Sequence, residues 1–248
     1  MDRHRVATQG LVLAALLVAV LLAGARLRAL TTETYADTRT LFGVPNFLNV
    51  ASNLAFLLAG IAGLALCASA RRPGKALASW RVFYAGMLLT SLGSAWYHLA
   101  PSDARIVWDR LGMTVAFVGL AFAVLGESTW VAIRPAILAT AIVAGAASVL
   151  WWRYTGDLAP YAWVQLAPLA CTATALAMRW IDQPLRRALE ASLGLYVLAK
   201  LAETFDGGLY MASAHVVSGH TLKHLLAAAA AAAILAAQTV RVPAAAGR

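Results

Sequence analysis

The sequence predicts an all-α polytopic membrane protein with a seven-helix transmembrane core and one extra N-terminal transmembrane helix. The 248 residues are 61% hydrophobic and only 12% charged, and their mean hydropathy is +0.72. A soluble domain of this length does not carry that balance, whereas a helical membrane protein does. Eight apolar segments of membrane-spanning length and an uneven distribution of basic residues complete the pattern.

Each apolar segment is about 20 residues long, which is the length that a helix needs to cross the hydrocarbon core. Clusters of proline, glycine and charged residues, such as those at 71–75 and 182–184, separate the segments and end the helices. The first segment follows Arg3 and Arg5 in the manner of a signal peptide, but we favour a retained helix because the charge distribution agrees with one. The expected spans are residues 10–29, 47–69, 80–100, 106–126, 130–151, 160–178, 187–205 and 215–239.

The basic residues favour one side of the membrane. With the N-terminus inside, twelve basic side chains fall on the inner side and five in the outer loops, so both termini are expected to be cytoplasmic. The formal net charge of +9 follows from these loops and does not indicate nucleic-acid binding. The scarcity of lysine in an alanine- and arginine-rich chain favours a bacterial inner membrane. The five outer residues are Arg26, Arg28, Arg39, Arg105 and Arg153.

No linker divides the chain into separate folding units. We expect residues 1–45 to form the N-terminal helix and an outer loop, residues 46–240 the seven-helix core, and residues 241–248 a cytoplasmic tail. Cys67 and Cys171 each fall within an apolar segment, so no disulfide framework is expected.

Three histidines enter the membrane at one depth in this topology. His98 ends one outward-running helix, and His220 and His224 open the last helix with the four-residue spacing that places them on one face. Three imidazoles that leave a fourth position to water form the ligand set of a catalytic zinc site. Zinc lowers the pKa of such a water towards about 7. The sequence therefore predicts Zn²⁺ held by His98, His220 and His224 near the outer leaflet.

Two further side chains at this depth supply catalytic chemistry. Asp109 falls in the first turn of its helix, where it is expected to orient or deprotonate the water. Ser94 lies one turn before His98 and is expected to stabilise negative charge on a carbonyl oxygen. This constellation indicates hydrolysis of an amide or ester in a lipid that arrives from the bilayer.

Other polar residues are candidates for orienting a ligand or touching the substrate. They are Asn49, Ser52, Asn53 and Glu203, although the asparagines could equally pin helix contacts and Glu203 could pair with Lys200. Lys223, between the two histidines, is expected to extend to the interface. His215 is off the face of His220 and is expected to be interfacial.

The combination of Ser94, His98, Asp109, His220 and His224 resembles the alkaline ceramidases, members of the CREST superfamily of seven-helix membrane zinc hydrolases. The segment from Asn49 to Asn53 is similar to the opening of that family's first core helix, and Glu203 to an acidic position in its penultimate helix. The resemblance spans residues 46–238. It implies cleavage of ceramide to a sphingoid base and a fatty acid, with the three histidines as zinc ligands, Asp109 as base and Ser94 as oxyanion stabiliser.

Two features depart from the family, whose eukaryotic members bind Ca²⁺ through an acidic N-terminal segment. Glu33 and Asp37 are the only carboxylates in the corresponding stretch, and Asn46 stands where the last glutamate is expected. A calcium site is therefore doubtful. The N-terminal helix is the second departure, because the seven-helix core does not require it.

Two other function classes remain open from the residues. One is a receptor-like or signalling protein with a structural zinc site. The other is a haem protein that uses His98 with His220 or His224 as axial ligands. The lipid substrate and its acyl length, the oligomeric state and the pH optimum stay undetermined.

Overall fold

The protein is built from α-helices. The computed structural model describes residues 2–27, 34–69, 76–129 and 133–240, and within them contains ten helices and no strand. The expected tail at 241–248 lies outside the described residues. The helices are α1 (Asp2–Leu27), α2 (Phe47–Ala51), α3 (Leu54–Ala68), α4 (Leu77–Leu99), α5 (Ile106–Thr129), α6 (Pro135–Thr155), α7 (Ala159–Ala177), α8 (Leu185–Thr204), α9 (Asp206–Ala212) and α10 (Gly219–Thr239).

The expected spans agree with the observed helices, with two differences. The span predicted at 47–69 is broken into α2 and α3 by a turn at Ser52 and Asn53. The short helix α9 was not predicted, because seven residues containing Gly207 and Gly208 carry little helical signal.

The protein is an all-α polytopic membrane protein. Within the described residues, five stretches are both long enough and apolar enough to cross a membrane: Arg3–Ala23, Phe47–Ala68, Ile106–Thr129, Pro135–Thr155 and Gly219–Thr239. Helices α4, α7 and α8 have 23, 19 and 20 residues and lie among them. Helix α8 contains two arginines, a lysine and two glutamates.

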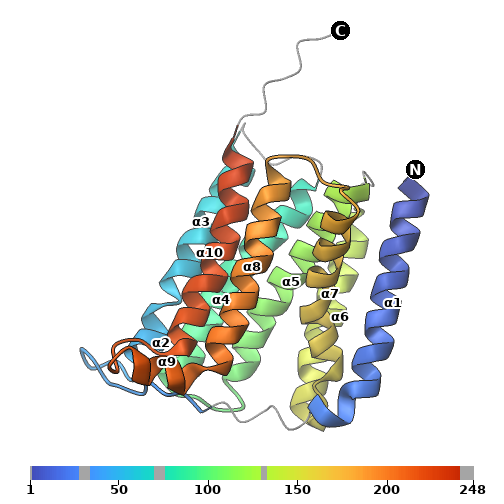
Figure 1. Ribbon diagram of the computed structural model, residues 1–248. Coiled ribbons are helices and arrows are strands. Elements are labelled where there is room, and N and C mark those ends of the chain that lie inside the picture. Colours follow the sequence, from blue (N-terminus) through green and yellow to red (C-terminus); the bar gives the residue numbers. More distant parts are fainter. Residues whose placement is uncertain (1, 28–33, 70–75, 130–132, 241–248) are drawn as a thin grey trace.

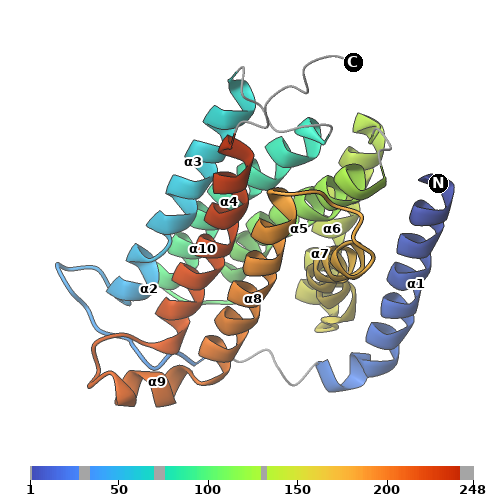
Figure 2. The same ribbon diagram turned by 45° about the horizontal axis from the view of Figure 1, so that its top comes forward.

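The long helices lie side by side (Figure 1). Contacts run from α3 to α4, from α4 to α5, from α5 to α6 and α7, from α7 to α8, and from α8 through α10 back to α3. Helix α1 lies at the edge of the bundle and packs along α7 (Figure 2). The start of α1 and the end of α10 are at one end of the bundle. Residues 34–46, α2 and α9 gather at the other, which we call the α9 end.

Close packing of α4 against α5 positions two of the predicted site residues. A Cβ atom added to Gly93 would lie 2.3 Å from the backbone oxygen of Trp108. The two helix backbones are therefore in direct contact, a closeness that only glycine permits. This contact brings the α4 turn that contains Ser94 against the α5 turn that contains Asp109.

Candidate metal centre

The structure brings the three predicted histidines together at the α9 end. One nitrogen from each of His98, His220 and His224 can be chosen so that all three lie within 4.8 Å of one another. The Nε2 atoms of His98 and His220 are 3.2 Å apart. All three residues are buried, with exposed fractions of 1–4%. The prediction that two distant helices meet at these imidazoles is confirmed.

The beginning of α10 is fixed by local interactions that the sequence encodes. Ser218 is the N-cap, and its side chain accepts a hydrogen bond from the backbone N–H of Thr221. A Cβ atom at Gly219 would lie 2.0 Å from the backbone oxygen of Ala202, so the first turn of α10 touches the last turns of α8. His220 and His224 then follow one turn apart and face α4.

One of the predicted orienting residues contacts a candidate ligand directly. The hydroxyl of Ser52 lies 2.8 Å from Nδ1 of His224. A hydrogen bond at Nδ1 fixes the ring and leaves Nε2 for an ion. Ser52 is available for this role because it lies in the turn between α2 and α3.

Two more of the predicted orienting residues, Asn49 and Asn53, hydrogen-bond to segments that lie next to the histidines. Asn49 donates to the backbone oxygen of Asp37 and accepts from the hydroxyl of Thr221. Asn53 donates to the backbone oxygen of Asn49. These two asparagines connect residues 34–46, α2 and α10, and their bonds lead to the neighbours of the histidines.

Glu203 takes part in a charge cluster. It forms ion pairs with Lys200, as one of its predicted alternatives stated, and with Lys223, whose Nζ lies 2.8 Å from Oε1. The ammonium group of Lys223 thus pairs with a carboxylate on α8, and the extension of this side chain to the interface stays a prediction. His215 is exposed and lies against Tyr210, outside the cluster.

Two residues that sequence reasoning did not select complete the surroundings of the histidines. The ring of Tyr35 packs edge-on against His98 and His220, with centroid separations of 4.9 and 4.4 Å. Asp206 accepts hydrogen bonds from two backbone N–H groups, those of Ala36 at 2.8 Å and His220 at 2.7 Å. No pattern marks Tyr35 in the sequence. The polar Asp206 before two glycines is a weak signal for a turn that binds backbone groups.

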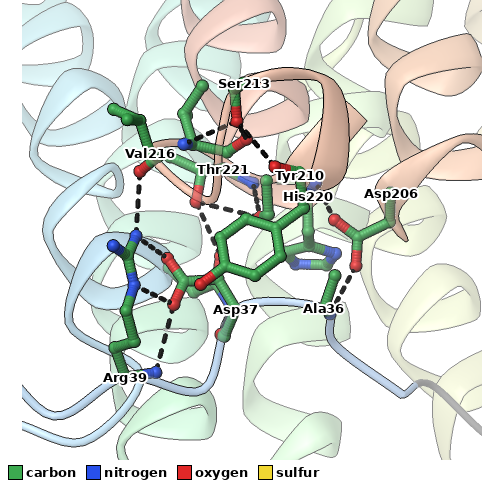
Figure 3. A network of polar contacts seen from close by, with 12 residues as sticks. Ala36, Asp37, Arg39, Asp206, Tyr210, Ser213, Val216, His220 and Thr221 are labelled. Carbon is green, nitrogen blue, oxygen red and sulfur yellow. Dashed lines mark hydrogen bonds and ion pairs between the residues drawn. The ribbon is translucent and has the colours of Figure 1, made fainter. Parts of the chain in front are cut away.

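A second group of polar contacts fixes the segment at residues 34–46 (Figure 3). Asp37 and Arg39 form two side-chain hydrogen bonds of 2.8 Å, and Arg39 also donates to the backbone oxygen of Val216. The hydrogen bonds from the Arg39 guanidinium hold the pKa of the Asp37 carboxyl below its usual range.

Two of the three residues considered for the doubtful calcium site, Asp37 and Asn46, have polar partners within the protein. The Asp37 carboxylate faces a guanidinium group, and the Asn46 side-chain amide donates to the backbone oxygen of His98. Glu33 lies outside the described residues.

The predicted catalytic residues border a cavity that two of the three histidines also line. The cavity has a volume of about 710 Å³, and Ser94, Asp109, His220 and His224 are part of its wall. Ser94 is 2% exposed. On the side away from the α9 end the wall is apolar and includes Phe83, Leu120, Leu189, Ala231 and Ile234. The arrangement therefore combines a polar site with a chamber suited to a hydrocarbon chain.

The donor set suits a transition metal. Two imidazole nitrogens bound to one tetrahedral Zn²⁺ at about 2.0–2.1 Å lie roughly 3.3 Å apart. The 3.2 Å separation of the two Nε2 atoms is close to that value. In addition, the buried Nδ1 of His98 has no hydrogen-bond partner in the described part of the chain. The three residues therefore fit a single ion.

Comparison with protein-family models and with curated proteins returns no match.

Proposed function

We propose that the protein is a zinc-dependent hydrolase that cleaves an amide bond of a lipid within the membrane, with ceramide as the substrate. The observation that supports it is the meeting of three buried imidazoles beside a cavity of about 710 Å³ in an apolar helical bundle. Sphingoid base and fatty acid are the products. The resemblance of Ser94, His98, Asp109, His220 and His224 to the alkaline ceramidases supports the same assignment.

In this proposal each ligand has a defined task. His98, His220 and His224 hold Zn²⁺, which suits neutral imidazole. When bound, zinc polarises a carbonyl oxygen and lowers the pKa of a coordinated water. Ser52 keeps the ring of His224 oriented through Nδ1.

The remaining steps belong to side chains in the cavity wall. Asp109 accepts the proton of the attacking water and passes it to the nitrogen of the leaving amine, as a general base and then a general acid. Ser94 donates a hydrogen bond to the carbonyl oxygen as negative charge develops there. The apolar part of the wall takes the acyl chain and excludes bulk water, which strengthens both interactions.

The proposed topology places this chemistry at the outer leaflet. The excess of basic residues on the side of the termini supports cytoplasmic termini, and the scarcity of lysine supports a bacterial inner membrane. The histidines are at the opposite, α9 end, so the substrate comes from the outer leaflet.

The first experiment combines metal analysis with turnover. Wild-type protein is expected to contain one zinc per chain and to release fatty acid from ceramide in micelles. His220→Ala is expected to lose both. His215→Ala is the matched control, since His215 is exposed and lies outside the cluster, and it should retain both.

Asp109→Ala separates the hydrolase from a receptor-like protein with a structural zinc. The hydrolase keeps its zinc and loses turnover by about 10²–10⁴-fold. If wild-type protein binds zinc stoichiometrically but hydrolyses no lipid, the result would support the metal centre and contradict the proposed enzymatic activity.

A further inference from the structure

A second feature of the cavity is a buried arginine, Arg110, which forms no ion pair with the described residues. Arg110 borders the cavity and is 6% exposed. Its guanidinium carbon lies 3.7 Å from the ring centroid of Trp152 and 5.3 Å from that of Tyr161. Its Nη1 atom, shielded from solvent, has no hydrogen-bond partner in the described residues, and no ion pair found there includes Arg110.

An ionised side chain in this position is costly, which makes it a candidate for ligand binding. The two aromatic rings compensate part of the desolvation through cation–π contact. They also fix the plane of the guanidinium group, so its donors are held in place for a planar or tetrahedral anion. The packing positions a cation and leaves at least one of its donors unused.

The balance of charges around the cavity also favours an anionic ligand. Within the described chain, three basic residues and three carboxylates border the cavity. Glu203 is shared by Lys200 and Lys223, and Asp206 accepts from two backbone N–H groups. Six formal charges therefore cancel before any ion binds. A divalent ion on the three imidazoles leaves the cavity with two excess positive charges in surroundings of low dielectric constant.

We propose that Arg110 is an anion-binding residue of this cavity and that the cavity takes an acyl lipid whose polar end is negatively charged. A carboxylate or a phosphate has the required chemistry, since both accept paired hydrogen bonds from a guanidinium. The inference rests on the proposed function, because it specifies the lipid class for the same cavity. Two sources supply such a group: the fatty acid that hydrolysis releases, and an acidic headgroup on the intact lipid.

The experiment measures binding and needs no turnover. Purified full-length protein in a neutral detergent is titrated with palmitate and with hexadecanol, which share a chain and differ in charge. Lysophosphatidic acid and its uncharged monoacylglycerol form the second pair. Each titration is run with zinc and again after chelation, because the ion itself attracts a carboxylate.

For the chelated wild-type protein, one charge-assisted contact predicts a preference of about 10- to 100-fold for the anionic member of a pair. Arg110→Gln should reduce this preference to near unity, and Arg110→Lys, which keeps the charge, should retain part of it. Arg105→Gln is the control, because Arg105 stacks on Trp96 at 3.9 Å but lies outside the cavity wall. It should leave the preference unchanged.

The outcomes distinguish the two proposals. Preference in the palmitate pair alone identifies the released fatty acid as the ligand, and preference in the lysophosphatidic acid pair identifies an acidic headgroup. Equal binding of charged and uncharged members, or a preference that survives Arg110→Gln, overturns the inference. An absence of ceramide hydrolysis with charge selectivity intact overturns only the proposed reaction.

Discussion

The hydroxyl of Ser52 lies 2.8 Å from Nδ1 of His224, although 172 residues separate them in the sequence. Ser52 reaches the histidine because the first core span is interrupted between α2 and α3. The turn between the two helices therefore places this hydroxyl beside a candidate metal ligand.

Ser52→Ala is expected to weaken zinc binding by about 10- to 100-fold, the usual effect of removing a partner of a metal-bound imidazole. Competition with a chromophoric chelator measures the affinity. Ser148→Ala is a suitable control, since Ser148 is also buried but bonds to the backbone oxygen of Gly145 in α6. Equal affinities of the two variants would show that Ser52 has no part in orienting His224.

Gly219→Ala is expected to destabilise the protein by about 1–3 kcal/mol, since overpacking carries that cost, and to reduce zinc content. The added Cβ would lie 2.0 Å from the backbone oxygen of Ala202 and 2.7 Å from the Cα of Asp206, so α10 must move away from α8. Thermal unfolding in detergent and metal analysis measure the two effects. Gly194→Ala, on α8 with nothing within 4 Å of the new Cβ, should leave stability unchanged or raise it. A tolerated Gly219→Ala would contradict the close contact of these helices.

Asp206→Ala is expected to cost about 1–3 kcal/mol because two partly buried N–H groups lose their acceptor. It should also detach residues 34–36 and speed the loss of zinc to a chelator, since Tyr35 covers two of the imidazoles. Asp157→Ala removes a comparable acceptor, for the N–H of Ala159 at the start of α7, and should not alter the rate of zinc loss. Identical rates in both variants would rule out a covering role for Tyr35.

The Asp37–Arg39 pair predicts a dependence of stability on pH. The pKa of Asp37 is lower in the folded protein than the value near 3.9 of an unfolded aspartate. Its contribution is therefore present above about pH 4 and is lost as the pH falls through the folded-state pKa. Asp37→Asn should remove this part of the acid sensitivity, so the difference in unfolding midpoint between variant and wild type narrows below pH 4. A constant difference across that range would contradict the assignment.

Much of this arrangement could be predicted because membrane helices and metal ligands leave strong signals. Apolar length gave the spans, and the spacing of His220 and His224 gave their shared face. The depth of His98 followed from the topology. Tyr35 could not be predicted, because an aromatic residue in a loop is common and its contacts depend on how the loop folds back. The ion pair of Lys223 with Glu203 could not be predicted either, since the two residues belong to different helices and their contact is a tertiary property.

The small side chains of α10 also set a limit on the molecule that the cavity can receive. Along this helix the wall runs from His224 past Ala227, Ala230 and Ala231 to Ile234, and ten residues of α-helix measure about 15 Å. Ile234, which is 1% exposed and packed in the core, lies at the far end of this stretch. Under the proposed function, an acyl chain lying along α10 would therefore have about 15 Å of wall between the histidine and this core residue.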